Sequence, residues 1–242
     1  MTDILLAGLV IFVTHSLEAV TGFGCTVLAL PFITALFGLK SGVMTLTVLA
    51  WVLALYIVIT KWRNIQWKQF GIIAGFMLLG LPIGMYLFRH VEAAPLKKAL
   101  AVFIVLAASY QLVAMRIPRL KDAKLPKPLG FFLLFAGGIV HGMFSSGGPL
   151  VVLYASNALP EKGKFRATLC LLWATLNTIL IGSYFFAGGF PRVTALNTAY
   201  MLPFLALGIA VGEWLHKRVN AEIFKFIVFA TLLATGVIML AA

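Results

Sequence analysis

GLVIFVTHSLEAV-TGFG-CTVLALPFITALF, residues 8–37, consists of two apolar arms separated by a glycine-rich break. LLFAGGIVHGMF-SSGG-PLVVLYASNAL, residues 133–159, has the same layout. Aligning Gly24 with Gly148 also places Val27 on Val151. With small gaps further along, the alignment places Gly80, Gly84 and Arg89 on Gly208, Gly212 and Lys217. Several matches in register predict an internal repeat, and paired interruptions of this kind point to a central site.

The composition places the repeat in a membrane. Sixty-two percent of the 242 residues are hydrophobic and only 11% are charged. The apolar runs are long enough to cross about 30 Å of hydrocarbon as helices, and they lack the alternation of a β-barrel strand. We therefore expect an all-α, polytopic helical membrane protein that crosses the membrane several times.

The net charge of +12 comes from basic residues that lie between the apolar runs. There they orient the chain and meet anionic lipid, so a nucleic-acid partner is not expected. Asp3 precedes the first run, which has no basic leader, and this argues against a removable signal peptide. Cys25 and Cys170 have no disulfide or metal-site spacing, and no cofactor or metal is predicted.

The basic stretch RIPRLKDAKLPK divides the chain into a first transmembrane repeat (1–115), a linker (116–128) and a second repeat (129–242). Besides the two broken segments, each half has three expected spans. They are Val43–Thr60, Trp67–Phe88, Leu96–Met115, Arg166–Ala187, Val193–Leu215 and Ala221–Ala242.

The basic residues help to choose a topology. If each broken segment crosses once, the 19 basic residues divide 9 to 10 between the two sides. If each is a hairpin of two helices, giving about five helices per half, they divide 14 to 5 toward the linker. The second division fits the positive-inside rule. It predicts inverted repeats, a cytoplasmic linker, two periplasmic termini and breaks that end inside the membrane.

The breaks have the chemistry of an anion site. The arm after each break presents free N–H groups and the positive end of its dipole, and two such ends would meet near a pseudo-twofold axis. Thr26 adds a hydroxyl donor, and Pro149 suits a first helical turn. Two kinks that only allow close helix packing are the alternative. The predicted substrate-binding residues are Thr21, Gly22, Phe23, Gly24, Cys25, His141, Ser145, Ser146, Gly147, Gly148, Arg166 and Asn177.

Ionisable residues within the spans suggest proton coupling. His15 and Glu18 are three residues apart on one arm, and His141 directly precedes the second break. A buried carboxylate needs a partner, so Glu18 is expected to pair with His15 or His141, as a proton relay or as a structural bond. Arg166 could attract an anion or anchor its span, and Glu213 is expected to form an ion pair at the membrane edge.

Two residue types have simpler interpretations. Cys25 could be reactive at a helix N-terminus, but a small apolar filler is the more frequent role. The tryptophans are expected mostly in an interfacial belt, and they are Trp51, Trp62, Trp67, Trp173 and Trp214.

The paired breaks TGFG and SSGG, together with a span that ends in the basic turn KWRNIQW, resemble the sulfite exporter TauE/SafE family, also called the toluene sulfonate uptake permeases. The resemblance covers the whole chain, although Phe23 and Cys25 depart from a fuller glycine run. It implies a permease that moves a small sulfur-containing anion, such as sulfite, sulfoacetate or another organosulfonate, across the bacterial inner membrane. Protons and membrane lipids are the further expected partners.

Two other classes remain open at this point. An intramembrane serine hydrolase would use Ser145 or Ser146 with His141. Against it, the first break contains no serine, and a duplicated catalytic pocket has no evident purpose. A channel or assembly subunit without transport activity is the third possibility. The chain contains no nucleotide-binding motif, so transport powered by ATP through this chain alone is not expected.

Overall fold

The computed structural model describes residues 2–117, 126–186, 188, 190–215, 226, 229–230, 233–234, 236–237 and 239–240. Within them the chain is built of helices, as the composition predicts. The elements are α1 (Thr2–Thr21), α2 (Cys25–Phe37), α3 (Leu39–Lys61), η1 (Trp62–Asn64), α4 (Trp67–His90), α5 (Ala93–Arg116), α7 (Lys127–Phe144), α8 (Gly148–Ala158), α9 (Lys162–Phe186) and α10 (Arg192–Leu215). Most of the expected span 221–242 and of the linker lies outside the described residues.

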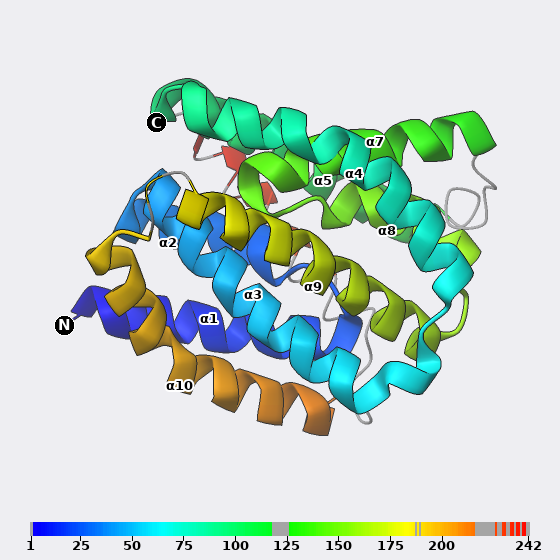
Figure 1. Cartoon of the computed structure of the whole chain (residues 1–242), viewed down its shortest axis with the longest axis horizontal. Coiled ribbons are helices and arrows are strands. Elements are labelled where there is room, and N and C mark those ends of the chain that lie inside the picture. Colours follow the sequence, from blue (N-terminus) through cyan, green and yellow to red (C-terminus); the bar gives the residue numbers. More distant parts are fainter. Residues whose placement is uncertain are drawn as a thin grey trace.

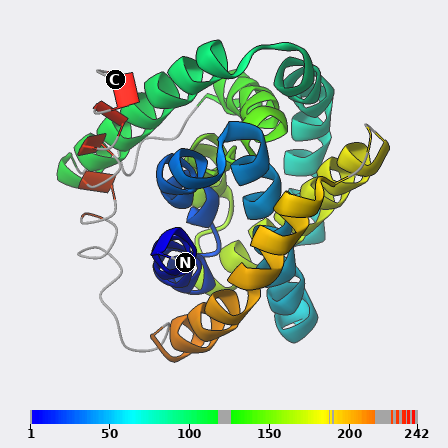
Figure 2. The same cartoon turned by 90° about the vertical axis from the view of Figure 1, so that its left-hand side faces the viewer.

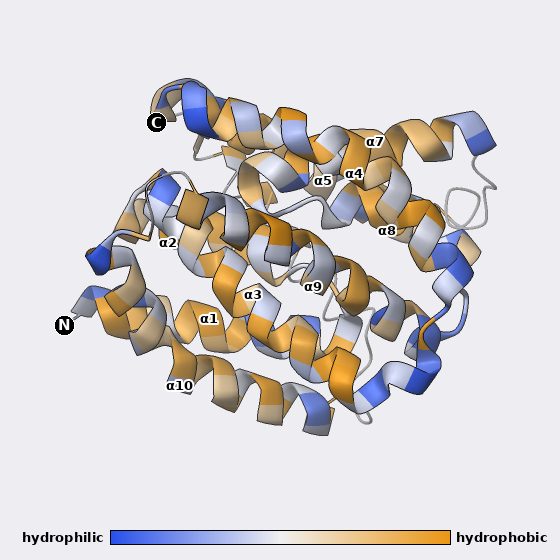
Figure 3. Ribbon diagram, in the orientation of Figure 1, coloured by the Kyte–Doolittle hydropathy of each residue, from blue (hydrophilic) through white to orange (hydrophobic). Residues whose placement is uncertain are grey.

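The helix bundle has the dimensions and composition to lie in a membrane. In the described part of the chain, seven helices are long and apolar enough to span it. Hydrophilic residues gather at the two ends of the molecule and apolar residues cover the helix bodies between them (Figure 3). The exposed apolar side chains of these bodies, such as Leu79 and Leu106, therefore face lipid.

α2 and α8 are too short to cross the membrane. With 13 and 11 residues they are about 20 Å and 17 Å long at about 1.5 Å per residue. α1 runs from the N-terminal end toward the interior, and α2 returns to that end, where α3 begins (Figure 1). The first break therefore lies within the bundle rather than at its surface.

Contacts between the two halves define the helix directions. On α3, Thr47 contacts Tyr184 of α9 and Trp51 contacts Thr178, so the two helices are antiparallel. Ser41 and Thr45 of α3 contact Thr194 and Thr198 of α10 in the same order along both chains, so these two helices are parallel. Figure 1 shows both relations. α3 and α9 are the third helices of the two halves. In an inverted repeat such equivalent helices run in opposite directions, whereas in a parallel repeat they run in the same direction.

Small residues bring two helix pairs into backbone contact. A Cβ atom on Gly84 of α4 would collide with the carbonyl of Ile139 on α7. A Cβ atom on Gly212 of α10 would collide with Ser16 and Ala19 of α1. Gly84 and Gly212 are aligned in the sequence of the two halves. They also occupy corresponding interfaces, because α4 and α10 are the fourth helices of their halves and each packs against the first helix of the other half. Close approach through small residues is a principal mode of helix association in membranes.

The two breaks are enclosed by the long helices. α1 and α2 lie near the middle of the bundle when it is viewed from the N-terminal end, with α4, α9 and α10 around them (Figure 2). Most of α2 is buried, from Cys25 to Pro31 without interruption. Non-helical backbone at this depth is tolerated because protein surrounds it and satisfies its polar groups.

Candidate functional site

The two breaks meet at one small pocket. Its lining comes from α1, α2, α3, α7, α8 and α9, and includes residues of both breaks. The lining residues are Glu18, Gly24, Thr26, Val27, Ala50, His141, Ser145, Ser146, Gly148, Pro149, Trp173 and Asn177. Seven of the residues singled out in the sequence are thus brought together: Glu18, Gly24, His141, Ser145, Ser146, Gly148 and Asn177.

The first break is a glycine turn that a carboxylate completes. Gly22 and Gly24 have φ of 84° and 105°, a left-handed region that glycine enters at little cost. α2 then begins at Cys25, whose backbone N–H donates to Oε2 of Glu18 at 2.9 Å. The buried Glu18 side chain therefore caps the N-terminus of α2.

The second break is held by a serine. Ser145 ends α7 in the left-handed conformation, with φ of 52°, where a helix more often ends in glycine. Its backbone N–H donates to the carbonyl of His141 at 2.7 Å, and its Oγ donates to Oδ1 of Asn177 at 2.9 Å. These bonds stabilise a backbone conformation that is costly for a residue with a side chain.

Asn177 presents its amide N–H groups to the pocket. Its Oδ1 accepts from Ser145 and also from Nε2 of His141, at 3.0 Å. A carbonyl oxygen can only accept, so His141 carries a proton on Nε2. Because Ser145 and His141 already bond to Oδ1, the Nδ2 amide group of Asn177 is the part that can donate hydrogen bonds to a ligand in the pocket.

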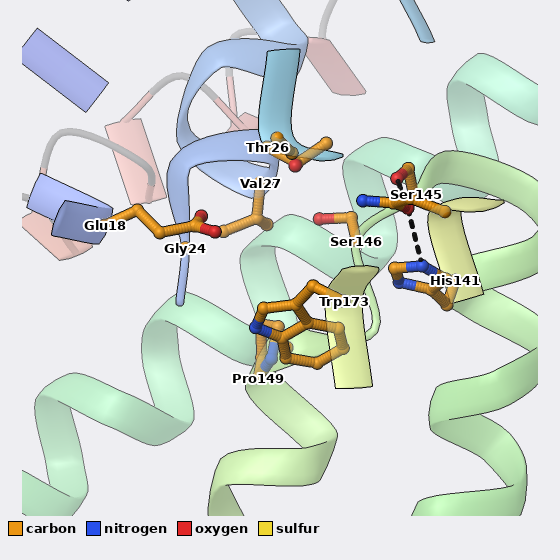
Figure 4. Close-up of a pocket in the computed structure, with 12 residues that line it drawn as sticks. Glu18, Gly24, Thr26, Val27, His141, Ser145, Ser146, Pro149 and Trp173 are labelled. Atoms are coloured by element: carbon orange, nitrogen blue, oxygen red, sulfur yellow. Dashed lines mark hydrogen bonds between the residues drawn. The ribbon is translucent and has the colours of Figure 1, made fainter. Parts of the chain in front are cut away.

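Further donors surround the pocket. Oγ of Ser146 is buried, 3% of the residue being exposed, and it has no hydrogen-bond partner among the described residues. Figure 4 shows Ser146 and Glu18 pointing into the pocket from opposite sides. The first-turn N–H groups of α2 and α8 have no intrahelical acceptor, and Pro149 occupies one of those positions without losing a bond. Buried donors without acceptors are the chemistry of an oxyanion site.

Trp173 is a site residue that the sequence interpretation assigned to the interfacial belt, and that assignment was wrong. Only 5% of it is exposed. Its indole N–H donates to the carbonyl of Gly22 at 3.0 Å, and its ring stacks on His141 with centroids 5.4 Å apart. Trp62, Trp67 and Trp214 are more than half exposed, as belt residues would be. Unlike these three, Trp173 lies in the middle of its span, only four residues before Asn177. That position could have indicated a place at the site.

Other lining residues were also outside the predicted set. Ala50 of α3 and Val27 of α2 are ordinary apolar residues, and nothing in the sequence distinguishes them. Thr26 lies two residues after Gly24 and Pro149 directly after Gly148; both were expected at the anion site, although neither was among the predicted substrate-binding residues.

Some predicted substrate-binding residues lie beside this pocket rather than in it. Thr21 and Phe23 line a small adjoining apolar pocket that shares Gly24, Val27 and Pro149 with the first. Gly22 offers its carbonyl to Trp173. Cys25 contributes its backbone N–H, while its thiol is fully buried beside Thr26, 3.6 Å from Oγ1. Gly147 packs against the carbonyl of Gly137.

Arg166 does not line the pocket. Its guanidinium forms an ion pair with Glu213 of α10, and its side chain is only 4% exposed. The predicted ion pair of Glu213 is therefore formed, and its partner is a buried arginine near the start of α9. Lys217 and Arg218, near which Glu213 was placed in the sequence, lie outside the described residues.

The predicted pair of Glu18 with a histidine is not formed. Glu18 reaches forward across the break to Cys25. His15 instead bonds through Nδ1 to the carbonyl of Ile11, at 3.0 Å, and contacts Thr14. A shared helix face brings two side chains within reach of each other, but the free N–H at the start of α2 is the stronger attraction for a carboxylate.

The geometry also bears on the hydrolase alternative. Ser145 donates to Asn177, and Ser146 has no partner in the described part of the chain, so neither hydroxyl is bonded to His141. A serine nucleophile needs that contact with its base. The arrangement offers hydrogen-bond donors to a ligand without an activated nucleophile.

Comparisons with known proteins agree with this picture. The family model described as "Sulfite exporter TauE/SafE" matches residues 6–239. A protein of Comamonas testosteroni described as "Probable inner membrane transporter protein TsaS" is 25% identical over 181 residues, which is 73% of each chain. No solved structure matches the chain significantly.

Proposed function

The chain belongs to the TauE/SafE sulfite exporter family, a membrane transporter and not an enzyme, and from this premise we propose that it is a secondary transporter of a small sulfur-containing anion. Candidate substrates are sulfite, sulfoacetate and other organosulfonates. The anion binds near the membrane midplane, in the pocket where the two glycine-rich breaks meet. The supporting observation is Ser146, a buried hydroxyl without a partner among the described residues, beside the N-terminus of α8.

The inverted repeat supplies the framework for alternating access. α3 and α9 run in opposite directions, and α1 packs on α10 as α4 packs on α7. The breaks then lie near the pseudo-twofold axis, where a rocking motion of one half against the other would expose the pocket to each side in turn. The distribution of basic residues supports an orientation with the linker in the cytoplasm and the termini in the periplasm.

Proton coupling is part of the proposal. Glu18 and His141 both line the pocket, so each is placed to exchange a proton when the ligand site opens. His15, the third residue predicted to carry protons, lies on α1 outside the lining.

Uptake into proteoliposomes tests the proposal. Radiolabelled sulfite and methanesulfonate should enter saturably, and faster with an inward proton gradient. Ser146→Ala removes one donor to a charged ligand, which should raise the KM about tenfold. The matched control is Ser156→Ala on α8, the helix that follows the break, because Ser156 is exposed and its Oγ donates to the carbonyl of Leu153.

Two results would contradict the proposal. The substrate class is wrong if neither anion is taken up saturably by the intact transporter. The site is misplaced if Ser146→Ala and Ser156→Ala transport with the same KM while both remain folded in detergent.

A further inference from the structure

The two halves of the pocket differ in charge. Glu18 precedes Gly24 by six residues, and the residue that precedes Gly148 by six is Gly142. A Cβ atom at Gly142 would collide with the carbonyl of Leu81, so close packing of α7 on α4 leaves no room there for a carboxylate. The N-terminus of α2 is therefore occupied by an acid of the protein itself, and the N-terminus of α8 is not.

No fixed positive charge offsets that acid. The described residues that line the pocket include no lysine or arginine. The nearby cation, Arg166, is engaged by Glu213. His141 already donates through Nε2 to Asn177, and its Nδ1 is buried with no partner among the described residues. The remaining donors, from Ser146, Asn177 and the first helical turns, are uncharged.

We propose that Glu18 makes the pocket select singly charged oxyanions over doubly charged ones, an inference that rests on the proposed transport function. A monoanion meets enough neutral donors to replace its water. A dianion brings a second charge toward Glu18 in a poorly screened interior, with no lysine or arginine in the lining to compensate. Sulfonates with a single charge and hydrogensulfite then bind well, whereas sulfate does not, and among the candidate substrates sulfoacetate, which also carries a carboxylate, binds less tightly than a sulfonate with one charge.

Competition between ligands of equal shape tests the charge selection. Methanesulfonate and sulfate are both tetrahedral and similar in size, and they differ by one charge. Against labelled sulfite uptake, methanesulfonate should compete at least about tenfold better than sulfate. Acetonylsulfonate, which has a methyl ketone in place of the carboxylate of sulfoacetate, should likewise compete better than sulfoacetate.

Glu18→Gln identifies the residue responsible. Glutamine keeps an oxygen that can accept the Cys25 N–H, so the cap on α2 is retained while the charge is lost. The ratio between methanesulfonate and sulfate should then fall to about threefold or less. Glu161→Gln is the matched control, because that exposed carboxylate pairs with Lys164 away from the pocket, and the ratio should stay unchanged. His141→Gln should also leave the ratio unchanged.

The outcomes separate the inference from the transport proposal. Equal competition by both members of each pair in the unaltered protein overturns the charge selection, even if Glu18→Gln fails to fold, and leaves transport standing. An unchanged ratio in folded Glu18→Gln overturns the role of Glu18. A ratio that changes with His141→Gln instead assigns the selection to an imidazolium. Absence of any saturable uptake overturns both proposals.

Discussion

At the scale of single residues, Trp173 joins the two breaks. Its indole N–H holds the carbonyl of Gly22 in the first break, and its ring lies on His141 beside the second. The Gly22 carbonyl is an acceptor in a turn with no regular helical partner, so the side chain of a distant span supplies its bond. One residue of α9 therefore fixes the geometry of both halves of the pocket.

Trp173→Phe should destabilise the protein by about 1–3 kcal/mol, because it leaves a buried carbonyl without its donor. Thermal unfolding in detergent measures the change. Trp67→Phe is the control, since Trp67 is 64% exposed and belongs to the membrane interface. Equal melting temperatures for the two variants would show that the bond to Gly22 does not hold the break.

At the scale of elements, α4 and α7 pack at a distance that only glycine permits. Gly84 lies against the carbonyl of Ile139, and Gly142 lies against the carbonyl of Leu81. In lipid, apolar surface by itself does not drive helices together, so close van der Waals contact must hold them. This interface also carries His141, one residue from Gly142, and so positions one wall of the pocket.

Gly84→Ala should lower the melting temperature strongly, because its methyl group meets backbone that cannot rotate away. Gly75→Ala on the same helix has nothing within 4 Å, and should be neutral or stabilising by up to about 1 kcal/mol through helix propensity. Comparing the two variants thus separates the effect of close helix packing from the effect of helix propensity on stability. A stabilising effect at both positions would be inconsistent with close contact between α4 and α7.

At the scale of the whole molecule, the helix directions determine which loops share a side of the membrane. Asn64 lies close to Gly163, so the loop after α3 and the start of α9 are at one end. The loop between α4 and α5, which contains Glu92, follows one crossing later and lies at the other end (Figure 1). Both native cysteines are fully buried, which leaves little background for surface labelling.

Single cysteines can check this arrangement. Asn64→Cys and Glu161→Cys, both at exposed positions, should react with a membrane-impermeant maleimide from the same side, which we propose to be the cytoplasm. Glu92→Cys, also exposed, should react from the opposite side. The unaltered protein serves as the control. Labelling of all three from one side would rule out the inverted arrangement.

Much of the fold could be predicted from the sequence because a membrane leaves few options. Backbone without water must be helical, so the expected spans between Val43 and Leu215 agree with the observed helices to within a few residues. The positions of both breaks were also predictable, since glycine runs inside apolar segments interrupt helices locally. Glu18, His141, Ser145, Ser146 and Asn177 stood out as polar residues in apolar surroundings, and all of them line the pocket.

The sequence by itself therefore determined the helices, the breaks and the small set of polar residues, because each depends on local chemistry and on the membrane as solvent. The tertiary structure decided which of those groups meet. It placed Trp173 between the breaks and paired Arg166 with Glu213. It also bonded Glu18 to the first N–H of α2 rather than to a histidine. Such pairings depend on the rotation and depth of helices from distant parts of the chain, and spacing along one helix carries no information about them.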